Sequence, residues 1–412
     1  MNYYLMNKNQ KLLEFYVENQ PLGEQVKEVR SFSDIRPIGF SDIATWVNTR
    51  NYAKHKDYLR EWAKSLGMDT VTGFLDISLA LGINDSLWVK RTDSDSRWEN
   101  VNLYQNQFSD VAEKTAFEAG LPGLNLSTTD IKSPEFTSEG SSPKCWKKEN
   151  DTIYLYKTGW AKEVLPDEPH GREPYSEFMA SQIAKEIVGE KAIPYDLVMF
   201  KNRLCTKCAL FTDENTGYVP LSKFLDLRRN YTLNDIINVG TDKGYEREFK
   251  EMFFIDSIVF NQDRHLGNFG FLVDNDTFQI KRFVPLFDFN LSMLCRTRDS
   301  YLNNFDSYRT SFAISHYLGG DFIEIGKALL DSDTKDMLPK EFVFPRHPLY
   351  NLPENRLQNL NDILNQTLNE ITGRKLYPIP FAEISVDLPG KQGSEHEESD
   401  EKYDDYDPRT DD

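Results

Sequence analysis

The segment that most constrains this chain is NQDRHLGNFGF at residues 261–271, followed by LFDFN at 286–290. It places Asp263 and Asn268 five residues apart and Asp288 twenty residues further on. The preceding stretch, YEREFKEMFFIDSIVFN, carries apolar residues at helical spacing and is expected to be a largely buried helix. The stretch between the two segments, GFLVDNDTFQIKRFVP, is expected to be a hairpin. Strands first, helices after and a hairpin between them predict an α+β chain of two lobes.

These three residues suit one kind of chemistry. Phosphoryl transfer needs a carboxylate to orient and deprotonate the acceptor hydroxyl, oxygen ligands for magnesium, and a cation to hold the phosphates. The spacing of Asp263 and Asn268 is that between the catalytic Asp and the metal-binding Asn of a kinase catalytic loop. Mg²⁺ favours carboxylate and amide oxygens, and Asp288 could supply a second carboxylate. A single Asp or Asn is more often a turn residue, so the ordered set is what indicates a site.

Three further features lie where such a site would need them. Lys157 stands inside the strand-like TIYLYKTG, where it could touch the phosphates. Glu177, early in the helix-like PYSEFMASQIAKEIVG, is a natural partner for that lysine. EGSSPK, residues 139–144, could fold over the phosphates with its backbone amides and Lys144. Read alone, these are a solvent-facing lysine, a surface glutamate and a flexible turn.

The order GSSPK, YLYK, SEFMASQIA, NQDRHLGNFGF and PLFDFN resembles the HipA family of bacterial serine/threonine kinases, over about residues 120–370. The resemblance implies a two-lobed kinase fold that uses ATP and Mg²⁺. It implies Asp263 as catalytic base, with Asn268 and Asp288 as magnesium ligands. It also implies Lys157 as the phosphate-binding lysine, partnered by Glu177, with the 139–144 loop over the nucleotide.

The resemblance also implies regulation and partners. Family members autophosphorylate a serine in or beside the phosphate loop, which ejects the loop and switches the enzyme off. Ser141 and Ser142 are the local candidates, with Ser138 as a third. Many members are toxins that phosphorylate aminoacyl-tRNA synthetases and are paired with a DNA-binding antitoxin. A protein substrate and an antitoxin-like regulator are therefore the expected partners, although the first 105 residues differ from the family's usual N-terminal domain.

Two other functions fit the same residues. The DRHxxN stretch also resembles phosphoinositide kinases, so a lipid or small-molecule kinase on the same fold is one alternative. A nucleotide-binding pseudokinase that acts as an interaction module is the other. Cys205 and Cys208 form a single CxxC pair, which we interpret as structural because no second pair accompanies it. His265 is interpreted as a residue that orders the loop.

Helix-like stretches with polar or glycine stops predict that residues 1–105 form a small helical N-terminal module of unknown role. Residues 106–385 are expected to form the kinase domain, with an N-lobe over about 120–215 and a C-lobe over about 216–385. Residues 394–412 hold ten acidic and two basic residues, so residues 386–412 are expected to be a disordered acidic tail.

Composition limits the partners further. The net charge of −18 argues against a chain that binds nucleic acid directly, because phosphates would be repelled. The apolar runs are far shorter than the roughly 18 residues that a membrane span needs. The N-terminus does not have the layout of a secretory signal, and four cysteines are too few for a disulfide framework. A cytoplasmic protein without membrane contact is therefore predicted.

Overall fold

The structure is a computed structural model that describes residues 1–117, 131–159, 171–312, 314–344 and 346–374. Residues Met1–Arg374 form one compact unit. The whole predicted acidic tail lies outside the described residues, so the prediction of a disordered tail stays a prediction. Within the described part, no helix is both long and apolar enough to cross a lipid bilayer.

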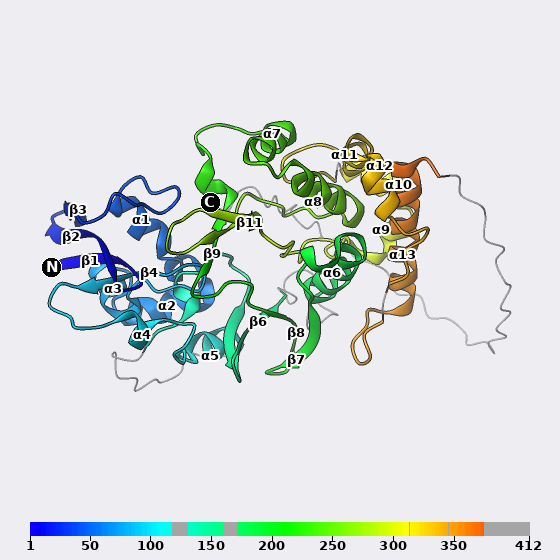
Figure 1. The fold of residues 1–412 in the computed structure, drawn as a ribbon. Helices are drawn as coiled ribbons and strands as arrows, with labels where there is room; N and C mark the ends of the chain where they lie inside the picture. The colour runs from blue at the N-terminus through cyan, green and yellow to red at the C-terminus, as the bar shows by residue number, and fades with distance from the viewer. Residues whose placement is uncertain (118–130, 160–170, 313, 345, 375–412) are drawn as a thin grey trace. The chain divides into compact units, whose positions relative to one another are not determined.

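The N-terminal module is not purely helical, which corrects the prediction from sequence. It opens with a four-stranded antiparallel sheet of order β3-β2-β1-β4 (Figure 1). Its strands are β1 (Asn2–Asn7), β2 (Gln10–Gln20), β3 (Gly23–Ser31) and β4 (Leu87–Arg91). Leu13, Phe15 and Val17 are buried on one side of β2 while residues between them are more exposed, a period-2 pattern typical of strands.

The predicted helices of the N-terminal module are present beside this sheet. They are α1 (Ile43–Arg50), α2 (Asp57–Ser65) and α3 (Val71–Ser78). Asp42 caps α1 through its side chain, because its carboxylate accepts the Thr45 amide. The short helices α4 (Trp98–Val101) and α5 (Val111–Phe117) follow.

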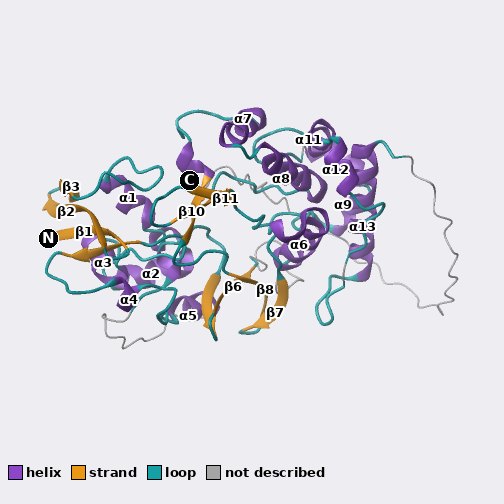
Figure 2. Cartoon of the chain, in the orientation of Figure 1, coloured by secondary structure: helices purple, strands orange, loops and turns teal. Residues whose placement is uncertain are grey.

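A second antiparallel sheet, of order β5-β6-β8-β7, corresponds to the predicted N-lobe strands (Figure 2). It consists of β5 (Lys144–Glu149), β6 (Thr152–Thr158), β7 (Asp196–Phe200) and β8 (Arg203–Ala209). The helix α6 (Glu173–Val188) lies between β6 and β7 in the chain, with Pro174 in its first turn and Gly189 at its C-cap. In register, Lys157 pairs with Lys144 on one side and with Thr206 on the other.

The third sheet contains the predicted hairpin, β10 (Gly270–Asp274) and β11 (Ile280–Phe283). It also contains β9 (Thr216–Pro220), which the sequence analysis did not identify. A Cβ at Gly270 would lie 2.3 Å from the Val219 carbonyl oxygen, so only glycine lets β10 approach β9 this closely. The helix α8 (Glu246–Val259) precedes the hairpin and is buried along most of its length, as predicted.

Further helices follow β9 in the described residues, and together with the three sheets they confirm the predicted mixed class of helices and strands. They are α7 (Leu233–Lys243), α9 (Asp299–Leu302), α10 (Phe305–Phe312), α11 (Phe322–Leu329), α12 (Ser332–Met337) and α13 (Glu354–Thr372). One apolar core joins α6, α8, the β9–β11 sheet, α11 and α13.

A second core joins the N-terminal module to the β5-β6-β8-β7 sheet. Side chains of β1, β2 and α1–α3 pack there with Tyr156 and Cys205 of the second sheet. Phe136, which lies just before β5, stacks on Trp62 of α2 with ring centroids 5.8 Å apart. The N-terminal module is therefore packed against the segment that leads into the predicted phosphate loop.

Candidate active site

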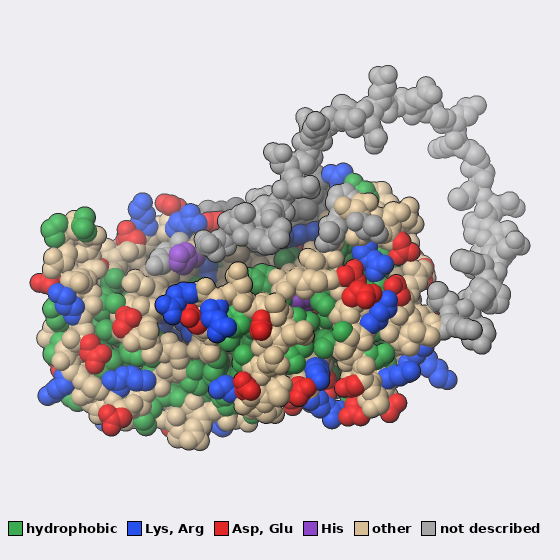
Figure 3. All heavy atoms as spheres, turned by 90° about the horizontal axis from the view of Figure 1, so that it is seen from above, with side chains coloured by type: hydrophobic (Ala, Val, Ile, Leu, Met, Phe, Trp, Pro, Cys, Tyr) green, Lys and Arg blue, Asp and Glu red, His purple; other side chains and the backbone are tan. Residues whose placement is uncertain are grey.

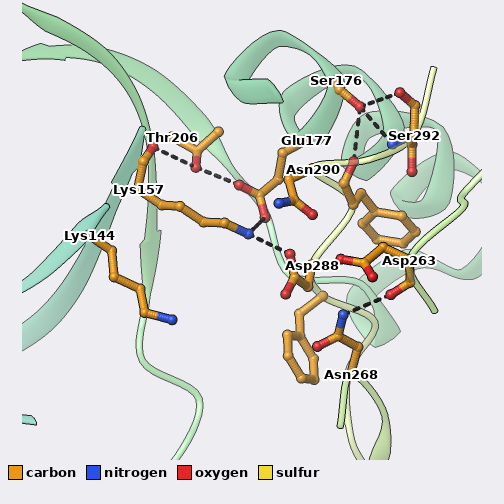
Figure 4. A network of polar contacts seen from close by, with 12 residues as sticks. Lys144, Lys157, Ser176, Glu177, Thr206, Asp263, Asn268, Asp288, Asn290 and Ser292 are labelled. Atoms are coloured by element: carbon orange, nitrogen blue, oxygen red, sulfur yellow. Dashed lines mark hydrogen bonds and ion pairs between the residues drawn. The ribbon is translucent and has the colours of Figure 1, made fainter. Parts of the chain in front are cut away.

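The centre of the site is the Lys157 ammonium, which lies between two carboxylates (Figure 4). Its Nζ is 3.3 Å from Glu177 Oε1 and 2.5 Å from Asp288 Oδ1. Lys157 and Glu177 are both buried, with 8% and 1% of their surfaces exposed. Lysines are seldom buried unless they are paired with an acidic group. Lys157 is therefore a paired, buried residue and not a solvent-facing strand lysine.

Glu177 is also held by β8, the strand that pairs with the Lys157 strand β6. Thr206 of β8 donates its hydroxyl to Glu177 Oε2 at 2.6 Å, while Oε1 faces Lys157. Thr206 pairs with Lys157 in the β6–β8 register, so one pair of strands presents both the lysine and the hydroxyl that orients its partner. Both carboxylate oxygens of Glu177 are thus engaged, and its orientation is fixed.

The charged groups of this cluster shift one another's pKa values. Burial raises the pKa of Glu177, and the nearby Lys157 ammonium only partly offsets that effect. Burial alone would lower the pKa of Lys157, but the Asp288 and Glu177 carboxylates outweigh it and hold that pKa above its usual value. Burial would raise the pKa of Asp288, yet Lys157 reverses this and the pKa lies below its ordinary value. Lys157 and Asp288 therefore stay charged near neutral pH.

Asp263 and Asn268 lie on the loop between α8 and β10, on the same side of the Lys157 ammonium as Asp288 (Figure 4). Asn268 donates its side-chain amide to the Asp263 carbonyl at 2.9 Å, and the Asp263 amide donates to Asn261 Oδ1 at 3.1 Å. Burial raises the pKa of Asp263, with Asp288 adding to the effect and His265 opposing it. A half-buried carboxylate with a raised pKa is suited to accept a proton.

A buried ion pair between Arg264 and Asp256 stabilises the loop that carries Asp263 and Asn268. Arg264 donates to both oxygens of Asp256 in α8, at 2.9 and 3.0 Å, and neither side chain is exposed. Its remaining nitrogen donates to the carbonyls of Asn268 and Phe287, at 3.0 and 2.7 Å. One guanidinium therefore ties the predicted catalytic loop to the LFDFN segment. The sequence analysis did not single it out, although it stands directly after Asp263.

His265 has the loop-ordering geometry that was expected of it. Its Nδ1 accepts the amide of Gly267 at 3.0 Å, and its carbonyl accepts the amide of Asn268 at 2.9 Å. Both bonds close turns inside the loop, and they hold Asn268 near Asp263.

The LFDFN segment carries two features that the sequence analysis missed. Asp288 has φ of +57°, a left-handed conformation that non-glycine residues seldom adopt and that is often found at functional sites. Its amide donates to the Tyr195 hydroxyl at 3.2 Å. Asn290 is buried, and its Oδ1 has no hydrogen-bond partner among the residues that the structure describes. Figure 4 shows this side-chain amide beside Glu177 and Asp288.

The 139–144 loop is present beside this cluster. Lys144 is buried at the start of β5 and donates to the Glu139 carbonyl across the loop. Its pKa is lowered to about 8, first by burial and then by the Lys157 ammonium. Gly140 has φ of +87°, and a Cβ there would lie 2.7 Å from Lys144 Nζ, so glycine is required for this close approach.

The three candidate serines differ in exposure. Ser141 is exposed, Ser142 is partly buried, and Ser138 is buried with 7% of its surface exposed. Lys56 of the N-terminal module also donates to the Ser138 carbonyl and to its hydroxyl oxygen. Ser141 and Ser142 are therefore the more accessible hydroxyls.

Other sequence candidates have simpler roles. Cys205 and Cys208 are free and buried, and burial raises the pKa of both thiols. Among the described residues, no three His, Cys, Asp or Glu side chains are grouped as a metal site. The interpretation of the CxxC pair as structural agrees with both observations. His170 lies outside the described residues.

The solved structures that are similar to this chain include a kinase and a protein of a toxin–antitoxin system. No protein-family profile matches the chain, and no curated protein matches it in sequence. The Helicobacter pylori proinflammatory kinase CtkA is similar at 18% identity and a TM-score of 0.42, over 56% of this chain and 92% of CtkA. Shewanella oneidensis MR-1 HipA, solved with HipB and its operator DNA, is similar at 12% identity and a TM-score of 0.46, over 90% of this chain and 97% of HipA.

HipA is thus among the solved structures that this chain is similar to.

Proposed function

We propose that this chain is an ATP- and magnesium-dependent protein serine/threonine kinase. The observation that carries the proposal is the Lys157 ammonium held between Glu177 and Asp288, with Asp263 and Asn268 beside it. A kinase needs a strand lysine positioned by a helix glutamate, together with a carboxylate that binds the metal. These residues come from β6, α6, the loop before β10 and the segment after β11.

The phosphate side of the site fits a polyanion. Lys144 and Lys157 extend from neighbouring strands in direct register, and each ammonium makes the other costlier to bury. A triphosphate placed between them would relieve that repulsion with charge-assisted hydrogen bonds. The backbone of the loop beside Lys144, which Gly140 allows to turn sharply, would cover it.

The oxygen donors fit magnesium. Asp288 would supply a carboxylate and Asn268 an amide oxygen, the hard donors that this ion prefers. The unpaired Oδ1 of Asn290, buried beside Asp288, is a further donor of the same type. When held by these residues, the ion would neutralise negative charge that develops on the phosphates during transfer.

Asp263 is the proposed general base. Its loop backbone is fixed by Asn261, Asn268 and the Arg264 ion pair, so its carboxylate is held ready for a substrate hydroxyl. Because its pKa is raised, the carboxylate is protonated, and base catalysis is lost, at a higher pH than for an ordinary aspartate as the solution is acidified.

The acceptor and the regulator follow from the motif resemblance. A protein hydroxyl is the proposed acceptor, and an antitoxin-like protein is the proposed regulator. On the described residues of the face in Figure 3, basic and acidic side chains are interspersed. Such a face lacks the continuous basic surface that nucleic-acid backbones require, in keeping with a protein acceptor.

Incubation with Mg²⁺ and γ-labelled ATP tests the proposal. We expect labelled phosphate on the chain itself or on a protein from a cell extract, with loss of label in Asp263→Ala. The matched control is Asp242→Ala, which removes an exposed carboxylate of α7. Label on phospholipid alone would favour a lipid kinase. Nucleotide binding without any transfer would favour a pseudokinase, and transfer undiminished in Asp263→Ala would contradict the assignment of the base.

A further inference from the structure

The N-terminal module reaches into the segment that leads to the phosphate loop through a buried lysine. Lys56, at the start of α2, has 1% of its surface exposed. Its Nζ is 2.5 Å from the carbonyl oxygens of both Glu135 and Ser138, and 3.3 Å from Ser138 Oγ. All three acceptors lie directly before the 139–144 loop. An ammonium with three donors is thus matched to three acceptors of one short segment.

A second contact reaches the loop itself. The Tyr52 hydroxyl donates to Glu139 Oε1, and the Tyr52 amide donates to the Phe136 carbonyl at 3.0 Å. The other oxygen of Glu139 lies against the catalytic loop, since a Cβ at Gly267 would be 2.7 Å from Oε2. Glu139 therefore lies between the N-terminal module and the loop that carries Asp263.

Stability alone is a poor reason for this arrangement. A buried ammonium loses its hydration, and burial holds the pKa of Lys56 well below its ordinary value. The Glu135 carboxyl is buried as well, and its oxygens are bound by Ser133 and the Trp146 amide. Even buried ion pairs can often be replaced by apolar residues of similar volume without loss of stability. A buried lysine that donates to three oxygens of one short segment can instead fix the path of that backbone.

We infer that the N-terminal module positions the nucleotide loop, with Lys56 and Tyr52 as positioning residues that hold residues 135–139 in place. This inference rests on the proposed function, because it assigns the loop to nucleotide phosphates. Lys56 fixes the segment before the loop, and Tyr52 fixes Glu139 against the catalytic loop. Lys144 closes the loop from its other end through the Glu139 carbonyl. The module of unknown role thereby becomes part of the nucleotide site.

Amide hydrogen exchange on the nucleotide-free protein tests the anchoring directly. In Lys56→Met and Tyr52→Phe, we expect faster exchange in peptides that cover residues 135–145, with α8 peptides unchanged. The matched control is Lys64→Met, which makes the same change at an exposed position of α2 and should leave exchange unaltered.

Kinetics then separate positioning from a merely structural role. Loss of the Tyr52 hydrogen bond should raise the KM for Mg–ATP about three- to tenfold, with kcat nearly unchanged. Lys56→Met should raise it more, because three acceptors lose their donor. A purely structural role would lower the fraction of active protein and leave KM unaltered.

If Lys56→Met does not fold, two variants keep the inference testable. Tyr52→Phe removes one oxygen atom, and the double variant Lys56→Met with Glu135→Gln removes both buried charges. Unchanged loop exchange and unchanged KM in these variants would overturn the inference. A wild-type protein that transfers no phosphate would refute the proposed function instead, and loop exchange would still decide whether the anchor exists.

Discussion

Replacing Arg264 with methionine should destabilise the protein severely, because a shorter apolar side chain takes the place of a buried guanidinium. The guanidinium and its partner Asp256 are both fully buried, so the variant leaves the Asp256 carboxyl in the core without its main cationic partner. Burial would raise the pKa of Asp256, but Arg264 outweighs it and holds that pKa below its usual value. The variant therefore removes the main reason for this carboxylate to be ionised inside the core.

The magnitude follows from what is left unpaired. Removing one member of a buried ion pair costs about 3–5 kcal/mol. The carbonyls of Asn268 and Phe287 also lose their donor, which brings the loss toward the upper end of that range. Because those carbonyls belong to the catalytic loop and the LFDFN segment, phosphoryl transfer should fall even where the variant stays folded.

Urea unfolding followed by circular dichroism measures the loss of unfolding free energy. The matched control is Arg228→Met, which breaks an exposed Arg–Asp pair of similar geometry and should leave the midpoint unchanged. Adding Asp256→Asn to Arg264→Met should recover part of the stability, because a neutral amide replaces the carboxyl left without its main cationic partner. A loss below about 1 kcal/mol for Arg264→Met, within the range of a surface pair, would refute the reasoning.

Four further predictions concern the site. Asp263→Ala should slow phosphoryl transfer by about 10²- to 10⁴-fold and leave Mg–ATP binding intact, as measured by calorimetry beside the transfer assay. Asp288→Asn should instead weaken magnesium-dependent nucleotide binding itself, and unchanged affinity in calorimetric titration would argue against Asp288 as a ligand. Lys144 loses its proton as the pH rises through about 8, so ATP affinity should decline above that pH. In Lys144→Arg the decline should vanish, because arginine stays charged. Peptide mapping after incubation with Mg–ATP should find phosphate on Ser141 or Ser142 rather than on buried Ser138, and phosphate confined to Ser138 would contradict the exposure argument.

Local pattern was enough to identify much of the site. The strand with Lys157, the helix with Glu177 and the buried helix before Asp263 were all predicted from apolar spacing and glycine or proline stops. These signals work because near neighbours in the chain decide strand and helix formation. The spacing of Asp263, Asn268 and Asp288 led to the hypothesis of a kinase. In the structure, these three side chains lie on one side of Lys157.

Other partners depended on the tertiary structure. Thr206 reaches Glu177 only because β8 pairs with β6 in one register, and a shift of one residue would turn its hydroxyl to the opposite face. Arg264 follows Asp263 directly, but its buried partner is decided by how the loop folds back on α8.

The N-terminal module gives the clearest example of this difference between local sequence pattern and tertiary contact. The alternation of buried and exposed residues in β2 is present in the sequence, but no sequence pattern indicates the role of Lys56. A lysine is ordinarily exposed, and nothing in local spacing indicates that its ammonium lies against carbonyls 79 and 82 residues further along the chain. Sequence patterns report which residues bury apolar surface, whereas the partners of buried polar groups are chosen by contacts between distant segments. Residue spacing and apolar patterns were therefore sufficient to propose the catalytic candidates, whereas the contacts that hold these candidates in place follow from the packing of distant segments.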